Sequence, residues 1–452
     1  MATVIKNGNV VTEQGVIKSD VKIVNGVITA LGVDLETSKE DQVIDASGKF
    51  VLPGVIDAHT HYNMANQLGV TADDVESGSK SAACGGVTTY IDFASPLEGK
   101  SLLESLLDKQ ANAEGHSYLD YHYHMEITGQ HDFSLEDLQQ LTRYGISSLK
   151  VYTTYADRLP DDQIKKLLAM VKETGQLVIF HAEDDDLIVS FREEFQKQNK
   201  TGVEYHAESR PHIAEVKAVQ NLLAMAKEID VPIYIVHVST GEACQIMKKA
   251  QEEGQKVYGE TCPHYLLLTA DCYKKEQAQR YMMTPPLRTE KDQELLWKGL
   301  QEGTLQCLTT DHCSYTVEQK LQFNTCFKAL NGIPGSETLL PLTYSEGVAK
   351  GRLSIEQLVA CLATNPAKLF GLYPQKGVIG VGSDGDITIL DPEKEVILTG
   401  EKLHSAAGYT PFEGIKVKGY PVATILRGNI IYQDGEFLAE KPQGRFVKAR
   451  VK

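Results

Sequence analysis

The sequence lacks the features that mark membrane, secreted and disulfide-stabilised proteins. No apolar run approaches the roughly 18 residues that a membrane-spanning helix needs. The first residues, MATVIKNGNVV, have neither the charged region nor the apolar core of a signal peptide. The eight cysteines are scattered and form no CxxC pair, so we expect reduced, buried thiols. These absences predict a cytoplasmic protein.

Basic residues are also scarce relative to acidic ones. Lysine and arginine total 45 against 61 aspartates and glutamates, which gives a formal net charge of −16. Nucleic acids and anionic membranes favour a basic surface, so we expect neither as a partner. Hydrophobic residues make up 42% and charged residues 23% of the 452 positions. That composition predicts a globular protein with a large core.

Short runs of alternating apolar and polar residues occupy both ends of the chain. Residues 1–50 contain two such runs, interrupted at Asn7-Gly8 and Asn25-Gly26 by a dipeptide that favours tight hairpin turns. The same alternating pattern occurs in VATILRGNIIYQDGEFL, with a turn expected at Asp434-Gly435. We predict that the two ends pair into one small β-rich domain. Residues 441–452 are basic and poor in core-forming side chains, so we expect a peripheral tail there.

The middle of the chain alternates short apolar runs with longer helical patterns. Eight runs have the apolar character of strands buried on both faces: VLPGVIDAH, VTTYIDF, LDYHYHMEI, ISSLKVY, LVIFHAE, PIYIVHV, KVYGET and LQCLTTD. Ser134 and Ser354 carry helix start signals. One helical face is expected to carry Ile213, Val216, Val219 and Leu223. Eight strand–helix units predict an α/β fold of the (β/α)8 TIM-barrel type.

Chemistry in such a barrel is expected at the carboxyl ends of the strands, and polar residues occur there. The candidates are His59 and His61 at the first strand, Lys150 at the fourth, His181 at the fifth, His237 at the sixth and Asp311 after the eighth. His59 and His61 are two residues apart, which directs both imidazoles to one face of an extended chain. Any one of these histidines alone is more often a packed or surface residue. Their joint placement predicts a metal centre, although zinc, manganese, nickel and iron all accept these ligand types.

Lys150 is the unusual member of this set. An isolated lysine at a strand end normally extends its amine into solvent. A charged ammonium beside two divalent cations is strongly disfavoured by repulsion and desolvation. Lys150 can therefore belong to a metal site only when it is deprotonated or converted to an acidic group, such as the carbamate that carbon dioxide forms with a neutral amine.

Nine motifs in chain order carry a resemblance to a known family: HTH after GVID, GISSLKVYTTY, HAE, YHAESRP, IVHVSTGEA, ETCPHYL, TPPLR, TTDHCSY and PFEG. Together they resemble the hydantoinase and dihydropyrimidinase branch of the cyclic amidohydrolases, with the bacterial phenylhydantoinases (D-hydantoinases) as the nearest group. The resemblance implies a homotetramer in which each barrel is flanked by a β-sandwich built from both chain ends. It divides the chain into residues 1–52 and 377–440 for the sandwich, 53–376 for the barrel and 441–452 for the tail.

The resemblance also implies a binuclear centre with two divalent metal ions per subunit, zinc first and manganese as the alternative. One metal takes His59, His61 and Asp311, the other takes His181 and His237, and Lys150 bridges both as N6-carboxylysine. A hydroxide between the metals is the implied nucleophile. Asp311 accepts its proton and passes it to the leaving nitrogen.

Three further residues match positions that contact the substrate in this family. Tyr155 donates a hydrogen bond to the developing oxyanion, although by itself it is more simply explained as a packing residue. The backbone at Thr284 and Asn331 holds the amide edges of the ring. The implied substrate is a small cyclic amide, and the implied reaction opens 5-substituted hydantoins or dihydropyrimidines to N-carbamoyl amino acids.

Neighbouring functions remain as alternatives. Dihydroorotases carry an arginine two residues after the HxH pair, where this chain has Asn63, so a carboxylated ring lacks its partner. Allantoinase is closer, because a ureido substituent needs hydrogen bonds and no cation. A non-catalytic, dihydropyrimidinase-like scaffold is the alternative outside enzymes. Such scaffolds lack several of the ligands that are all present here.

The sequence departs from the family at three places. Asp184 replaces an asparagine, which we interpret as the solvated acidic start of a helix. Thr284 stands where serine is usual, a change with little effect if the backbone binds the substrate. The segment GIPGSETLL lacks the acidic and arginine residues of relatives, which leaves the pocket wall or a subunit contact open to change.

Overall fold

The computed structural model describes residues 2–451 and has a parallel barrel at its centre. All eight predicted strands form and lie in chain order around the barrel: β6 (Val55–Thr60), β9 (Val87–Ala94), β10 (Asp120–Glu126), β11 (Ser148–Tyr152), β12 (Leu177–His181), β13 (Ile233–Ile235), β14 (Val257–Thr261) and β15 (Cys307–Leu308). Each neighbouring pair is parallel. A parallel bridge between Thr60 and His312 joins the first strand to the segment after the eighth. The (β/α)8 prediction is therefore confirmed.

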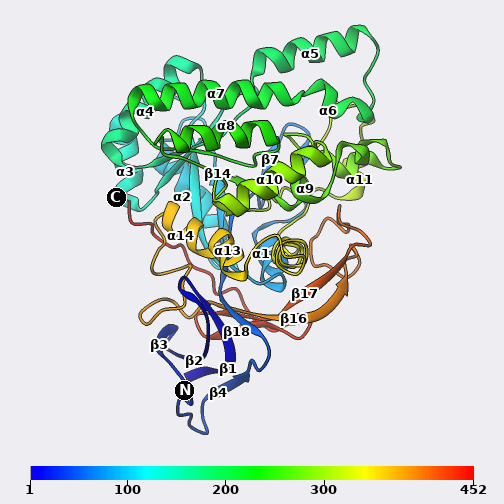
Figure 1. Ribbon diagram of the computed structural model, residues 1–452. Coiled ribbons are helices and arrows are strands. Elements are labelled where there is room, and N and C mark those ends of the chain that lie inside the picture. The colour runs from blue at the N-terminus through cyan, green and yellow to red at the C-terminus, as the bar shows by residue number, and fades with distance from the viewer. Residues whose placement is uncertain (1, 452) are drawn as a thin grey trace.

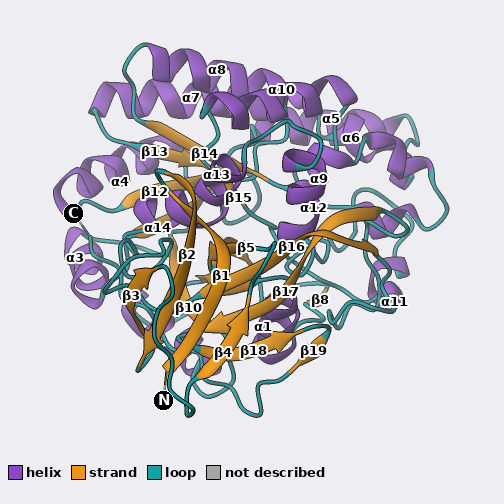
Figure 2. Cartoon of the chain, turned by 60° about the horizontal axis from the view of Figure 1, so that its bottom comes forward, coloured by secondary structure: helices purple, strands orange, loops and turns teal. Residues whose placement is uncertain are grey.

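Helices surround the barrel and pack their apolar faces on its strands (Figures 1 and 2). They are α1 (Val75–Cys84), α2 (Leu102–Ala113), α3 (Leu135–Tyr144), α4 (Asp161–Thr174), α5 (Asp185–Lys197), α6 (His206–Ser209), α7 (His212–Ile229), α8 (Gly241–Glu252), α9 (Pro263–Leu267), α10 (Glu290–Glu302), α11 (Val317–Leu321), α12 (Leu339–Thr343), α13 (Ile355–Val359) and α14 (Asn365–Leu369). Shorter helical turns cover Val203–Tyr205, Ala270–Lys274, Ala278–Tyr281, Tyr344–Val348 and Ala360–Thr364. Within residues 2–451, no helix combines the length and apolarity needed to cross a membrane.

Both predicted helix starts form, and the predicted apolar face of α7 is buried except at its first residue. Ser134 and Ser354 each cap a helix and form a reciprocal capping box with the residue three positions later. On α7, Val216, Val219 and Leu223 are buried as predicted, whereas Ile213 in the first turn is 40% exposed. The helix has only begun at Ile213, so the barrel does not yet cover that face.

The two chain ends pair in a second sheet below the barrel (Figure 1). Its strands are β1 (Ala2–Thr12), β2 (Gly15–Val24), β3 (Val27–Gly32), β4 (Gln42–Asp45), β5 (Phe50–Pro53), β16 (Ile387–Ile397), β17 (Lys416–Leu426), β18 (Asn429–Gln433) and β19 (Glu436–Phe437). Antiparallel pairing of β5 with β16 joins the ends, and aliphatic side chains from both enclose a core of their own. A separate two-stranded hairpin, β7 (Ala65–Asn66) with β8 (Gly69–Val70), follows the first barrel strand, β6, along the chain.

The expected tight turns form at two of three places. Asn25-Gly26 joins β2 to β3, and Asp434-Gly435 joins β18 to β19, each with positive φ at both residues. The prediction of a turn at Asn7-Gly8 is wrong. These residues lie inside β1, where the pairing register with β2 shifts between Ile5 and Gly8, so the dipeptide forms a bulge.

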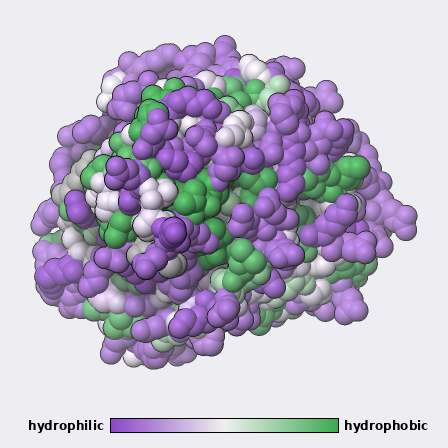
Figure 3. Space-filling view, turned by 90° about the horizontal axis from the view of Figure 1, so that it is seen from below, coloured by the Kyte–Doolittle hydropathy of each residue, from purple (hydrophilic) through white to green (hydrophobic). Residues whose placement is uncertain are grey.

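The expectation of a peripheral C-terminal tail is also wrong. Val447 is 2% exposed and packs with the apolar residues inside the barrel. Its backbone N–H donates to the carbonyl of Tyr121 at 2.8 Å, and its own carbonyl accepts from Nδ1 of His122 at 2.9 Å. The preceding Phe446 stacks on His122 with 5.7 Å between ring centroids. Alternate apolar residues among the basic ones thus cover the barrel near the amino-terminal end of β10. Seen from below Figure 1, on the side of the second sheet, the surface is mainly hydrophilic, with apolar side chains in separate groups (Figure 3).

Candidate active site at the carboxyl ends of the barrel strands

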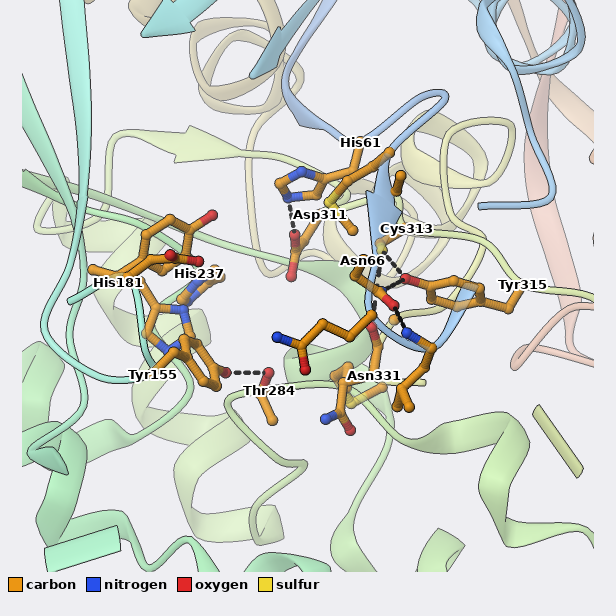
Figure 4. A pocket seen from close by; sticks show the side chains of 18 of the residues that line it. His61, Asn66, Tyr155, His181, His237, Thr284, Asp311, Cys313, Tyr315 and Asn331 are labelled. Atoms are coloured by element: carbon orange, nitrogen blue, oxygen red, sulfur yellow. Dashed lines mark hydrogen bonds and ion pairs between the residues drawn. The ribbon is translucent and has the colours of Figure 1, made fainter. Parts of the chain in front are cut away.

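A cavity of about 490 Å³ opens at the carboxyl ends of the barrel strands. All nine residues predicted for the site line it: His59, His61, Lys150, Tyr155, His181, His237, Thr284, Asp311 and Asn331. They come from positions spread over some 270 residues of sequence, and the parallel strands bring them to one edge. Figure 4 shows the labelled side chains arranged around the central space.

His59, His61 and Asp311 form one side of the site. Nε2 of His59 lies 3.1 Å from Oδ1 of Asp311, and Nε2 of His61 lies 3.2 Å from the same oxygen. Burial raises the pKa of Asp311, but the neighbouring His59 and His61 outweigh this effect and hold the pKa well below its usual value. The carboxylate is therefore ionised and offers its oxygens to a cation.

His181 and His237 form the opposite side of the site. Their ring centroids are 4.6 Å apart, and the ring of His237 lies 5.4 Å from that of His59. Nδ1 of His237 is buried and has no hydrogen-bond partner among the described residues. His237 also has a positive φ of 38°, a conformation that is costly for a residue with a Cβ.

The electrostatics favour ligation by neutral imidazoles. Burial lowers the pKa of His61, His181 and His237, which keeps these rings in the form that binds metals. For His59, burial acts in the same direction, but Asp311 and Glu260 outweigh it and raise the pKa to about 9. A cation at Nε2 of His59 would replace that proton. One ligand atom each from His59, His237 and Asp311 lie within 4.8 Å of one another, so these residues fit a metal ion.

Two buried glutamates orient these histidines, and the sequence reasoning missed their role. Oε1 of Glu260 lies 2.5 Å from Nδ1 of His59, and Oε2 of Glu183 lies 2.7 Å from Nε2 of His181. Such bonds fix the tautomer and leave the opposite nitrogen free for a metal. Both glutamates stand in quoted motifs, HAE and ETCPHYL. Glu260 nevertheless lies 201 residues from His59, so no local spacing indicates that they pair.

Lys150 lies in the middle of β11, two residues before its end, and is 1% exposed. Its amine lies 5.0 Å from the ring centroids of Phe93 and Tyr152 and forms no ion pair with any described residue. Burial lowers the pKa of Lys150 to about 8, although nearby carboxylates act in the opposite direction. At pH 7 most of the amine is therefore still protonated, but about a tenth of it is neutral and nucleophilic, far more than for an ordinary lysine.

Tyr155 and Thr284 meet at the rim of the cavity (Figure 4). The Tyr155 hydroxyl donates to Oγ1 of Thr284 at 2.6 Å and accepts from Nη2 of Arg210 at 3.3 Å. Burial raises the pKa of Tyr155 to about 12, against the opposing effect of Arg210. The phenol therefore stays protonated and can donate a hydrogen bond. Arg210 also binds Glu183, so it links the tyrosine to the partner of His181.

The loop around Asn331 requires the glycine that follows it. Gly332 has a φ of 140°, and a Cβ there would lie 2.3 Å from the carbonyl oxygen of Cys313. Its N–H donates to the carbonyl of Met282 at 2.9 Å, which connects this loop to the Thr284 segment. Oδ1 of Asn331 is buried without a partner among the described residues, so an acceptor remains available in the cavity wall.

Two departures from the family pattern have a local explanation. Asp184 is the N-cap of α5 and accepts from the backbone N–H of Leu187 at 3.0 Å, which confirms the interpretation as a helix start. The segment after Gly332 does not line the cavity. Within it, the Glu337 carboxylate accepts hydrogen bonds from the Ser81 hydroxyl and from the backbone N–H of His404. This segment therefore packs against α1 and the loop before β17.

A (β/α)8 barrel with four histidines, a lysine and an aspartate around one cavity is typical of metal-dependent hydrolases. The Amidohydrolase family model matches residues 50–431. The D-hydantoinase of Ralstonia pickettii is 39% identical, with 100% of this chain and 99% of that protein covered. The D-phenylhydantoinase of Escherichia coli is 37% identical, with 100% of this chain and 98% of that protein covered. The solved structure of the dihydropyrimidinase of Brevibacillus agri superposes with a TM-score of 0.97. It is 36% identical and covers 100% of this chain and 99% of its own.

The chain therefore belongs to the amidohydrolase family, in its hydantoinase branch, and is a cyclic amidohydrolase. The resemblance inferred from the nine sequence motifs is confirmed.

Proposed function

We propose that this enzyme opens the cyclic amide of 5-substituted hydantoins or dihydropyrimidines by adding water, which releases N-carbamoyl amino acids. The observation that carries the proposal is the convergence of four histidines, a buried lysine and an aspartate on one cavity. The hydantoinase relatives support the choice of a cyclic amide.

The proposal assigns two divalent cations to this centre, preferably zinc. His59, His61 and Asp311 would hold one, His181 and His237 the other, and Lys150 would bridge them as a carbamate. The lowered pKa values of His181 and His237 favour neutral imidazoles, and the lowered pKa of Asp311 favours the carboxylate, which supports this ligand set. Such a centre would supply Lewis-acid polarisation of the amide carbonyl and would lower the pKa of water, so that hydroxide is available as the nucleophile near neutral pH.

The protein's own groups then complete the reaction. The carboxylate of Asp311 faces the centre of the cavity, so it can accept the proton of the attacking water and deliver it to the leaving nitrogen. The phenol of Tyr155 can turn from Thr284 to the carbonyl oxygen as negative charge develops there. The backbone at Thr284 and Asn331 would hold the amide edge of the ring.

We expect Tyr155→Phe to lose catalytic rate while keeping its metals. Removing one donor to an oxyanion costs about 2.7–4 kcal/mol, or about 10²–10³ in kcat. Steady-state kinetics with metal analysis checks this, and Tyr205→Phe, outside the cavity lining, is the matched control. An unchanged kcat would leave Tyr155 with a packing role only.

The cavity lining bears on the ring that is accepted. Met64, Leu68 and Ala329 provide apolar surface, and Gln67 adds an amide, whereas no arginine is among the described lining residues. An apolar or aromatic 5-substituent fits this mixture, and a carboxylated ring lacks a cation. Allantoin remains the second candidate, because the amide of Gln67 could bind a ureido group.

A substrate panel tests the proposed function. Metal-replete enzyme is assayed with hydantoin, both enantiomers of 5-phenylhydantoin, dihydrouracil, allantoin and dihydroorotate. We expect the highest kcat/KM for a 5-phenylhydantoin or for dihydrouracil. A clear preference for allantoin would select the second candidate, and no turnover of any ring would reject both.

Activation should depend on pH in a direction set by Lys150. Only the neutral amine reacts with carbon dioxide, and burial lowers the pKa of Lys150 to about 8. At fixed dissolved carbon dioxide, the rate at which metal-free enzyme regains activity should rise as the pH increases towards 8 and level off above it. A rate independent of pH between about 6 and 9 would argue against carbamate formation at this amine.

The proposal also includes a homotetramer in the cytoplasm, supported by the family resemblance. Light scattering of the purified protein measures the assembly directly.

A further inference from the structure

A second buried lysine, Lys320, lies beside the cavity and takes no part in the ligand set. It stands on α11, the short helix that follows the Asp311 loop, and is 2% exposed. Its ammonium donates to three backbone carbonyls, those of Met282 at 2.8 Å, Leu330 at 2.6 Å and Gly332 at 2.8 Å. It forms no ion pair with any described residue.

Three carbonyls match the three donors of an ammonium group. Burial lowers the pKa of Lys320 to about 7, whereas hydrogen bonds from the charged form to carbonyl oxygens favour that form. Loss of the amine would leave the carbonyls of Leu330 and Gly332 without this donor, whereas the Met282 carbonyl would keep only its bond from the Gly332 N–H. Unsatisfied buried carbonyls draw the backbone towards other partners or water.

The three carbonyls belong to two separate segments that both reach the cavity. Met282 precedes the lining residues Met283 and Thr284, whereas Leu330 and Gly332 flank Asn331. Figure 4 shows Thr284 and Asn331 on the side of the cavity away from His61. Lys320 thus binds the main chain on either side of Asn331 and just before Thr284.

The neighbouring residue on α11 attaches a third part of the wall. Nε2 of Gln319 donates to the carbonyl of Val70 at 2.9 Å, in the β7–β8 hairpin whose residues 64–68 line the cavity. The helix α11 therefore connects the chain after Asp311 to three segments of the substrate pocket.

We propose that Lys320 is a positioning residue that holds the Thr284 and Asn331 segments at the separation required to grip the amide edge of the ring. This inference rests on the proposed function, because it takes those two segments as the substrate-binding backbone. It requires no contact between Lys320 and the substrate.

The test combines kinetics with local hydrogen exchange. In Lys320→Met, we expect the KM for 5-phenylhydantoin or dihydrouracil to rise by about tenfold or more, with metal content unchanged. Amide exchange should accelerate in peptides covering 280–286 and 328–335 and stay unchanged in the barrel strands. Lys328→Met, an exposed lysine on the same loop, is the matched control and should behave as wild type.

Several outcomes would overturn this role. An unchanged KM with unchanged exchange in both segments would show that Lys320 positions nothing. Loss of metal, or faster exchange throughout the barrel, would indicate a general structural role. If Lys320→Met does not fold, the KM of Lys320→Arg is measured in its place, because a planar guanidinium cannot place its donors at the same three carbonyls. Lys320→Arg should then show the raised KM, and a wild-type KM would refute the proposal.

The exchange measurement separates this inference from the proposed function. If the wild-type enzyme opens no cyclic amide, the proposed function fails, yet the exchange of the two segments still reports whether Lys320 holds them. If wild type is active and the segments do not respond to the substitution, the inference about Lys320 fails alone.

Discussion

Lys150→Ala should nearly abolish both metal binding and the hydrolysis of cyclic amides. The substitution removes the proposed bridge and leaves the four histidines and Asp311 to hold two cations whose mutual repulsion is less compensated. Small carboxylic acids such as acetate or propionate should restore part of the activity, because they fit the space of the missing side chain and supply two oxygens. Metal analysis and steady-state kinetics, with and without added acid, measure both effects.

Lys150→Arg provides the matched control for charge. It keeps a cation at a site that is 1% exposed but cannot form a carbamate, so it should be inactive and should not respond to added acids. Full activity in either variant would contradict the bridging role of Lys150.

Asp311→Asn should lower kcat by about 10²–10⁴, the usual contribution of a positioned acid–base group. The amide is nearly isosteric and keeps one oxygen towards His59 and His61, but it cannot accept and release a proton. Because the pKa of Asp311 is held well below its usual value, the wild-type carboxylate should remain ionised throughout the working pH range. Kinetics at saturating metal separate the loss of proton transfer from weaker metal binding.

Asp157→Asn is the control for Asp311, since it removes a carboxylate from the exposed rim of the same cavity. We expect its kcat to remain within about twofold of wild type, in line with the small effect of exposed charges. A comparable loss in both variants would indicate that the general charge of the cavity, and not Asp311 itself, controls the rate.

The barrel could be predicted from the sequence because its strands are buried on both faces. Such strands have almost continuous apolar runs, and the helices between them carry capping signals that the structure confirms at Ser134 and Ser354. The ligand candidates followed from the same pattern, since the carboxyl ends of parallel strands meet at one edge.

Local patterns failed where a feature depends on distant contacts. The bulge at Asn7-Gly8 depends on pairing with β2, and the C-terminal tail is buried because the barrel offers an apolar surface around His122. The pairing of Glu260 with His59 spans 201 residues. Lys320 left no signal at all, because its partners are backbone carbonyls, which every residue carries.

In the proposed mechanism, the four histidines, Lys150 and Asp311 form a two-metal centre that opens cyclic amides. The most direct test of this claim is a zinc titration of metal-free, bicarbonate-equilibrated enzyme, in which hydrolysis of 5-phenylhydantoin and dihydrouracil is followed at each addition. We predict that activity rises from near zero and reaches its maximum at about two zinc ions per chain. Activity that does not depend on metal, or the absence of activity at every zinc concentration, would contradict the claim.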